Sequence, residues 1–196
     1  MAGAARQLTM TVAEFLAWDD GTEERHELID GVPVAMALPA AFHGTLAVNV
    51  AVAVDRRLRG RALCRGQSEA GIQLADHTMV VADLAVTGLP IANTPAVEEP
   101  FLLVEVLSPS TKAFDLQVKV KRFSALPSVE EIWLVDIERR WVQVWQRAGE
   151  VWIVRIVEGE ESFDSAALGD RVTLDELYRN VGVEALLSEY RTNRRA

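Results

Sequence analysis

The segment 101-FLLVEVLSPST-111 combines an apolar run, typical of a buried β-strand, with a carboxylate in its middle. Phe101 to Leu107 form the apolar run, and Glu105 interrupts it. An ionised carboxylate in apolar surroundings costs free energy unless a cation, a metal ion or hydrogen bonds compensate it. The segment therefore predicts a central strand of a sheet and a charged or polar partner for Glu105.

A second apolar run, 79-MVVADLAV-86, is interrupted in the same way by Asp83. Two acids on neighbouring central strands repel each other, and a divalent cation between them would reverse both penalties. Oxygen ligands suit Mg²⁺ or Mn²⁺, which we therefore expect as the cofactor. For either acid alone, an ion pair with Lys or Arg, or a strand end that reaches solvent, is the simpler interpretation.

The segment 111–125, TKAFDLQVKVKRFSA, predicts a helix that supplies cations. Asp115, Lys119 and Arg122 share one helical face, and Lys112 precedes them. Such stripes are usually solvated salt bridges. A functional interpretation is that Lys119 points back to the end of the acidic strand, where an ammonium could orient water and stabilise a phosphate.

The remaining patterns predict an α/β domain with a mixed sheet flanked by helices. A capping box at Thr11 and Glu14 starts the first helix, and Asp30-Gly31 marks a hairpin turn. We expect helices at about 11–18, 42–58 and 111–125 with a short closing helix after Thr173, and strands at about 26–37, 62–67, 71–74, 79–87, 101–107, 131–137, 140–147 and 150–157. The last two strands form an added antiparallel hairpin that is more exposed.

Length and composition favour one soluble domain over residues 1–196, with flexible tails at 1–9 and 190–196. The net charge of -9 argues against a surface coated generally with nucleic acid. The single Cys64 excludes an internal disulfide and a cysteine zinc site. No apolar run reaches the length of a membrane span, and no export signal is evident, so we expect a cytoplasmic protein.

Several of these pieces together resemble the Uma family of bacterial restriction-endonuclease-like proteins, in the PD-(D/E)xK nuclease superfamily. They are 27-ELIDG-31, the Asp83 strand, 105-EVLSPST-111, the D-x-x-x-K helix and 131-EIWLVD-136. The resemblance runs from about Thr11 to Trp145. It implies a restriction-endonuclease-like core and a divalent-metal-dependent endodeoxyribonuclease that hydrolyses DNA phosphodiester bonds.

The resemblance also implies roles for individual residues. Asp83 and Glu105 correspond to the two acids of the metal site. Lys119 corresponds to the catalytic lysine, because Leu107 occupies the position where the superfamily signature places that lysine. Glu27 would be an additional acid near the metal.

The sequence departs from the family pattern at three positions. Ala82 precedes Asp83 where the family has Pro, and His26 and Phe123 stand where Tyr is common. None of these changes removes a metal ligand. The missing proline would have restricted the backbone conformation of the residue before Asp83.

Candidate substrate contacts are His43, Lys112, Lys121 and Arg122. The family often carries a His where His43 stands, and it could contact phosphate, support a metal ligand, or simply lie at a helix end satisfied by backbone. The basic residues could bind DNA phosphates or form a solvated face.

Two further interpretations stay open. One is a nuclease-fold module that binds or assembles without catalysis, and the other is a structural homodimer. In the second, tryptophans at strand spacing would lie in the core or at a dimer interface. They are Trp133, Trp141, Trp145 and Trp152.

Overall fold

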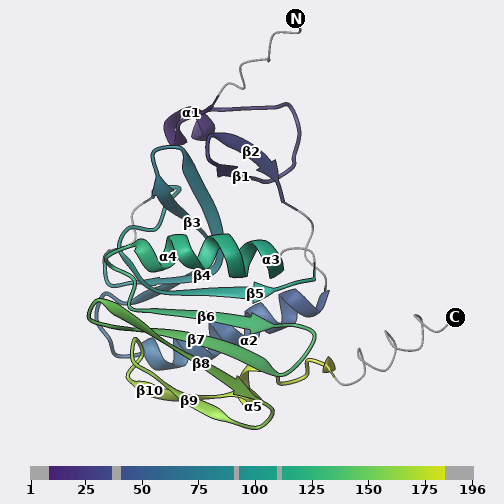
Figure 1. Cartoon of the computed structure of the whole chain (residues 1–196), viewed down its shortest axis with the longest axis vertical. Helices are drawn as coiled ribbons and strands as arrows, with labels where there is room; N and C mark the ends of the chain where they lie inside the picture. The colour runs from purple at the N-terminus through teal and green to yellow at the C-terminus, as the bar shows by residue number, and fades with distance from the viewer. Residues whose placement is uncertain (1–8, 37–40, 91–92, 110–111, 184–196) are drawn as a thin grey trace, which may run out of the picture.

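One mixed sheet, with helices on both faces, organises the chain in a computed structural model that describes residues 9–36, 41–90, 93–109 and 112–183 (Figure 1). Its strand order is β2-β1-β4-β5-β6-β7-β8, and β3 pairs with β4 outside this path. The strands are β1 (His26–Ile29), β2 (Val32–Ala35), β3 (Arg65–Ala75), β4 (Thr78–Thr87), β5 (Pro100–Leu107), β6 (Glu131–Asp136), β7 (Trp141–Ala148) and β8 (Val151–Glu158). A separate hairpin contains β9 (Ser162–Ser165) and β10 (Asp170–Thr173).

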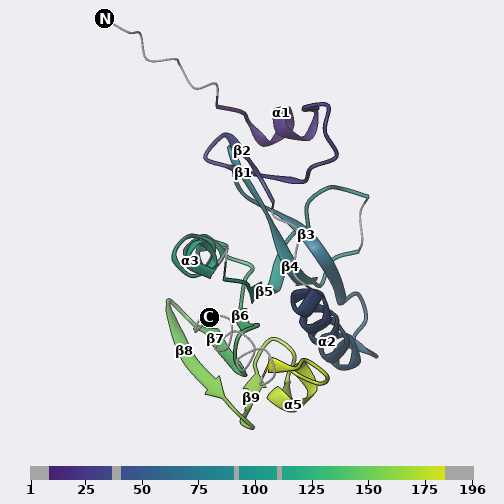
Figure 2. The same cartoon turned by 90° about the vertical axis from the view of Figure 1, so that its right-hand side faces the viewer.

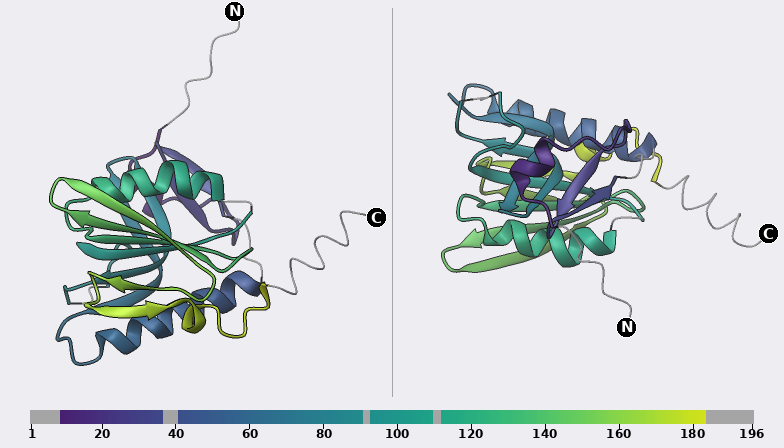
Figure 3. Two further views of the ribbon diagram at one scale, coloured as in Figure 1. Left: turned by 60° about the horizontal axis from the view of Figure 1, so that its bottom comes forward. Right: turned by 90° about the horizontal axis from the view of Figure 1, so that it is seen from above.

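The helices are α1 (Val12–Leu16), α2 (Ala41–Leu58), α3 (Lys112–Phe114), α4 (Val120–Ala125) and α5 (Leu174–Leu177), and a π-helical turn, η1 (Asp115–Lys119), joins α3 to α4. The sheet lies between α2 and the continuous α3–η1–α4 helix, as seen from above in Figure 3. This arrangement agrees with the predicted helix-flanked mixed sheet. None of the helices in the described ranges is both long and apolar enough to cross a membrane.

The three strands predicted to be central are adjacent in the sheet. Strands β4 and β5 run antiparallel, whereas β5 and β6 run parallel, with Glu105 opposite Leu134. Parallel neighbours need a crossover connection, which the α3–η1–α4 helix provides. Both faces of these strands are therefore covered, which explains their almost continuous apolar sequences.

Each face of the sheet has its own hydrophobic core. On one face, the four-residue repeat of α2 buries Leu46, Val50, Val54 and Leu58 with a set that includes Trp133. On the opposite face, the α3–η1–α4 helix buries Val120 and Phe123 against Leu103, Leu107 and Leu134. Figure 2 shows α2 and α3 on opposite sides of the strands. The side chain of Glu105 alternates with Val104 and Val106, so it points to the α3–η1–α4 side.

Local capping signals correctly predicted the starts of two helices. Thr11 and Glu14 form the predicted capping box of α1, and Thr173 and Glu176 form that of α5. The Asp30-Gly31 turn also joins β1 to β2, with both residues at positive φ. The predicted cap at Ser110 or Thr111 and most of the predicted tails lie outside the described residues.

The structure differs from the secondary-structure predictions at two places. β3 is one strand rather than two, because pairing with β4 continues past the polar sequence that suggested a break. The β9–β10 hairpin was not expected, since its short strands lack a strong apolar alternation. The predicted hairpin of β7 and β8 is more exposed than the central strand β6, as expected, and most of this exposure lies on β8.

Gly71 in β3 allows the loop after β4 to lie directly on the sheet. Its carbonyl accepts a hydrogen bond from Val97 N at 2.8 Å. A Cβ at position 71 would meet Pro95 O at 2.3 Å and Met79 Cε at 2.5 Å. The backbone contact leaves no space for any side chain.

We predict that Gly71→Ala lowers the free energy of unfolding by about 1–3 kcal/mol, because the loop or strand must move. Gly66→Ala is the matched control in the same strand, where the added Cβ would be 3.6 Å from Leu84 Cδ1. Urea denaturation of both variants measures the difference. Equal stabilities would contradict the close approach at Gly71.

Candidate metal and active site

Strands β4 and β5 separate at the two predicted acids. Their paired register ends at Leu84 and Val104, and Asp83 and Glu105 are the next residues beyond it. Beyond this point β4 is hydrogen-bonded to β3 and β1, whereas the described partner of β5 is β6 alone. The backbone N–H of Val106 donates to Asp83 Oδ2 at 2.7 Å, so the side chain of Asp83 replaces the missing strand partner. The divergence therefore fixes both acids at the same place.

Glu105 is more deeply buried than Asp83, with 3% of its surface exposed. Burial raises its pKa well above the usual value; the Lys119 ammonium opposes this effect, and the charges of Asp83 and Asp115 add to it. Its Oε1 atom is buried and accepts no hydrogen bond from the described residues. Glu105 thus has an unsatisfied oxygen in a region that disfavours its charge.

Lys119 lies between several oxygen atoms. Its Nζ donates to Val81 O at 2.9 Å and lies 3.0 Å from Glu27 Oε1, 3.2 Å from Glu105 Oε1 and 3.8 Å from Asp115 Oδ1. Burial alone would lower the pKa of Lys119, but the surrounding carboxylates outweigh it and raise that pKa. Lys119 is consequently a buried ammonium.

Glu27 reaches this cluster from the N-terminal hairpin. β1 pairs with β4 at Leu28 and Met79, which brings the neighbouring Glu27 to the open half of β4. Its Oε1 accepts a hydrogen bond from Val81 N at 2.8 Å in addition to its ion pair with Lys119. The ELIDG segment therefore supplies an acid to the cluster.

Asp115 joins the cluster from the helix, and sequence analysis did not select it as a site residue. It is 2% exposed, and its carbonyl accepts from Val120 N across the π-helical turn. π-Helical turns inside α-helices are frequent at functional sites. The available signal was its four-residue spacing from Lys119, which was interpreted as part of a solvated stripe.

His43 contacts the cluster from the opposite helix. Its Nε2 atom lies 3.4 Å from Asp83 Oδ2. A hydrogen bond to Asp83 raises the pKa of His43, although partial burial opposes this, and contacts with Val106 and Asp115 raise it further. His43 is therefore placed to hold Asp83, or to contact a ligand beside it.

The other three predicted contacts lie outside this cluster. Lys112 Nζ is 2.7 Å from Asp136 Oδ2, a fully buried carboxylate at the end of β6. Arg122 pairs with Asp30 at 2.8 Å and so connects α4 to the β1–β2 turn. Lys121 is exposed. Two of the three thus have structural partners within the fold.

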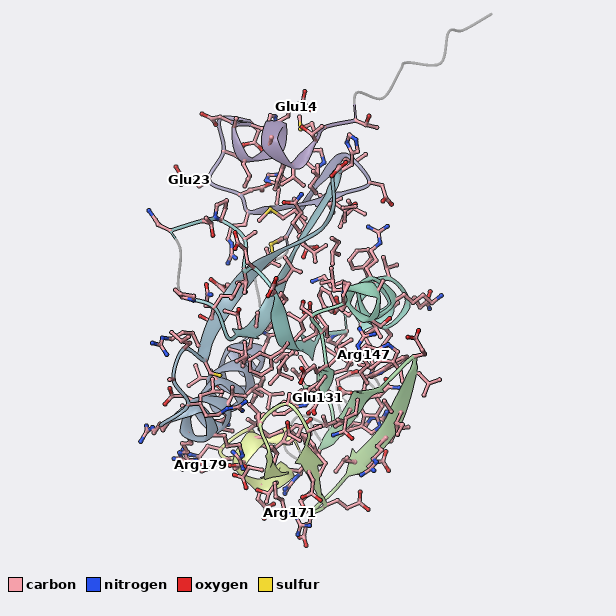
Figure 4. All side chains as sticks on the ribbon, turned by 90° about the vertical axis from the view of Figure 1, so that its left-hand side faces the viewer. Glu14, Glu23, Glu131, Arg147, Arg171 and Arg179 are labelled. Atoms are coloured by element: carbon pink, nitrogen blue, oxygen red, sulfur yellow. The ribbon has the colours of Figure 1, made fainter. Side chains whose placement is uncertain are left out.

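Buried acids elsewhere show how this fold satisfies a carboxylate that has only a structural role. Glu131 lies among the strands (Figure 4) and is fully buried. Its oxygens accept hydrogen bonds from Trp133 Nε1, Gln146 Nε2 and Ala167 N. Both oxygens of Glu131 have donors, whereas Oε1 of Glu105 has none.

The cluster carries more negative than positive charge. Its carboxylates are Glu27, Asp83, Glu105 and Asp115, against the cations Lys119 and, when protonated, His43. The four carboxylates offer oxygen ligands, which suit Mg²⁺ or Mn²⁺. In the part of the chain that the structure describes, no three acidic, His or Cys side chains form a ready cation cage. Magnesium commonly binds through one or two carboxylates and retains water, so the residues fit such a cation.

Comparisons with known proteins agree with this fold. Two uncharacterised proteins of Synechocystis sp. are each 26% identical, over 172 and 166 residues, and the alignments cover 86% and 78% of this chain and 90% of each relative. A crystal structure from Anabaena variabilis, described as "a putative nuclease belonging to DUF820", has a TM-score of 0.71 at 18% identity. The match covers 88% of this chain and 99% of that one, and it shows a shared fold.

The model of the Uma2 family, described as "Putative restriction endonuclease", matches residues 12–175. That range contains every residue of the acidic cluster and the whole sheet. The resemblance expected from the sequence motifs is confirmed. The chain belongs to the Uma2 family and has its restriction-endonuclease-like nuclease fold.

Proposed function

We propose that the protein is a divalent-metal-dependent endodeoxyribonuclease. The observation that carries this proposal is Oε1 of Glu105, which is buried, has only its ion pair with Lys119 to compensate it, and lies next to a second acid where two strands separate. An oxygen in that position is expensive unless a cation binds it. Membership of the Uma2 family supports nuclease activity as the purpose of such a cation.

Asp83 and Glu105 would hold the Mg²⁺ or Mn²⁺ ion. A bound divalent ion lowers the pKa of a coordinated water and neutralises charge on a phosphoryl oxygen. The hydrogen bond from Val106 N and the contact with His43 orient Asp83. Because the protein fixes Asp83 in this way, little reorganisation is needed when a cation binds.

Lys119 would be the positive charge that orients the attacking water and stabilises the developing phosphorane. Its burial strengthens its interaction with a phosphate, since no bulk water screens it. Val81 O and Glu27 hold its Nζ in place. Glu27 would therefore act mainly by positioning Lys119.

DNA is the proposed substrate, and a DNA substrate would place the protein in the cytoplasm. Lys121 is exposed on the same helix as Lys119 and has the charge to contact the DNA backbone. His43 is placed beside Asp83 to contact a phosphate. Lys112 and Arg122 would contribute their remaining donors at the edge of the site.

We predict that Asp83→Asn and Glu105→Gln each reduce plasmid nicking in Mg²⁺ or Mn²⁺ by about 100-fold or more, because each removes a proposed metal ligand. Asp164→Asn, in β9 and far from the cluster, is the matched control and should cleave like wild type. Agarose-gel assays of supercoiled plasmid measure all four proteins.

Equal cleavage by wild type and both site variants would eliminate this site assignment. Cation binding without cleavage, on any DNA tested, would favour the alternative of a nuclease-fold binding module. That outcome would leave the fold and family unchanged.

Glu105 also has a predictable effect on stability. A carboxyl group with a raised pKa in the folded protein stabilises the fold fully below its unfolded pKa, near 4.5. This contribution is lost as pH rises through the folded pKa. At neutral pH, therefore, Glu105 costs the metal-free protein stability.

We predict that Glu105→Gln raises the Tm of the metal-free protein by about 2–4 °C at neutral pH, equivalent to about 1 kcal/mol at this size. The gain should increase as pH rises above about 4.5, because the wild-type cost increases as Glu105 ionises. Mn²⁺ should raise the Tm of wild type but not of the variant. A less stable Glu105→Gln protein, with an unchanged response to Mn²⁺, would contradict the assignment.

Strand β8 favours self-association as an additional property. It ends the sheet and has four exposed apolar side chains. They are Val151, Ile153, Val154 and Ile156. Edge strands are usually protected against pairing. The short opposite edge strand β2 contains Pro33, whereas β8 contains neither Pro nor Gly. We propose that two copies pair antiparallel through β8.

The tryptophans take little part in this proposed contact. Trp133 and Trp141 are buried in the two cores. Trp145 and Trp152 are half-buried, and Arg147 stacks on Trp152. The core interpretation therefore holds for the first two tryptophans.

We predict that Ile153→Lys halves the molar mass measured by light scattering after gel filtration, because a charge at the strand centre opposes edge pairing. Val48→Lys is the control, since Val48 is an exposed apolar residue on α2. A monomeric wild type, or a dimer unaffected by Ile153→Lys, would contradict pairing through β8.

A further inference from the structure

The ammonium of Lys119 occupies the place where the buried acids most need positive charge. Its Nζ lies within 3.8 Å of oxygens from Glu27, Glu105 and Asp115. These acids come from three separate elements, β1, β5 and the π-helical turn. Lys119 itself is 6% exposed, so it has little access to solvent as an alternative partner. In the metal-free protein it therefore provides much of the charge compensation for all three.

The contacts of Lys119 are unequal. Its Nζ donates a hydrogen bond to Val81 O and pairs with Glu27, which itself accepts from Val81 N. Glu105 Oε1 lies 3.2 Å from the same Nζ but accepts no hydrogen bond there. The ammonium is consequently held from the β4 side, and its contact with Glu105, at 3.2 Å, is longer than its contact with Glu27, at 3.0 Å. This contact is the one that Lys119 can lose without losing its hydrogen bond.

A cation bound to Glu105 would have to share that carboxylate with Lys119. Two positive charges close to one oxygen repel each other, and the repulsion is strong where water is excluded. Each therefore weakens the binding of the other, and such coupling is reciprocal.

We propose that Lys119 is a built-in competitor of the divalent cation. It neutralises Glu105 when no metal is bound and gives up this contact when a metal binds, while Val81 O and Glu27 retain it. This inference rests on the proposed function for the identity of the cation. It adds a role for Lys119 that precedes catalysis. Lys119 then sets the affinity for the metal, and in the metal-free protein it offsets the repulsion among the buried carboxylates.

The test is cation binding by Lys119→Met without DNA, so it does not depend on cleavage. Methionine is unbranched, apolar and flexible enough to fill the same space. We expect Lys119→Met to have a lower Tm than wild type in chelator, because three buried carboxylates lose their cation. We expect it to bind Mn²⁺ about tenfold more tightly by calorimetry, within the usual range of coupling between two ligands.

Arg57→Met is the matched control. Arg57 lies on α2, outside the acidic cluster, and its largely buried side chain pairs with Glu176 at 2.7 Å. It should lose stability for the same physical reason, but its Mn²⁺ affinity should equal that of wild type. A second variant, Lys119→Gln, keeps a donor for Val81 O and should also bind Mn²⁺ more tightly. It replaces Lys119→Met if that protein does not fold in chelator.

The possible results separate this inference from the proposed function. If wild type binds Mn²⁺ and the neutral Lys119 variants bind it equally or more weakly, the competitor role is wrong and the metal site stands. If only the neutral variants bind Mn²⁺, Lys119 is confirmed as the occupant and the metal-dependent function of wild type fails. If no protein binds Mn²⁺, the competitor role is wrong, and the plasmid assay decides on the nuclease independently.

Discussion

The separation of β4 from β5, with Lys119 opposite the acids that it exposes, is the constraint on which the rest of the structure depends. Paired strands satisfy their own backbone groups, whereas separated strands need other partners. Asp83 accepts a hydrogen bond from the N–H of Val106. Lys119 donates to the carbonyl of Val81, and Glu27 accepts from the N–H of Val81. The charged residues of the site thus also complete the hydrogen bonding of the sheet where two strands diverge.

This dual use explains why the site requires elements from both ends of the fold. The N-terminal hairpin provides Glu27, and the crossover helix provides Lys119. Arg122 connects the same two elements through Asp30 and also donates to Thr78 on β4. We infer that Arg122 keeps the hairpin and the helix at a fixed separation, which in turn keeps Glu27 close to Lys119.

The buried acids divide into two groups according to their partners. Glu131 and Asp136 have complete or direct compensation within the fold, from neutral donors and from Lys112 respectively. Glu105 is incompletely compensated and therefore reduces stability. Such a cost is expected where a site must accept a cation that is not part of the chain. The distinction lies in the partners and not in the depth of burial.

The sequence by itself determined the features that depend on neighbours along the chain. They include both capping boxes, the Asp30-Gly31 turn, the apolar repeat of α2 and the two apolar central strands that Asp83 and Glu105 interrupt. Contacts between distant residues decided the rest. The single strand β3 depends on its pairing with β4, the partner of Arg122 lies 92 residues away in the sequence, and the burial of Asp115 depends on the π-helical turn. A helical stripe of charges looks the same in sequence whether water or a sheet lies opposite it, so only the tertiary structure showed that Lys119 is buried among carboxylates.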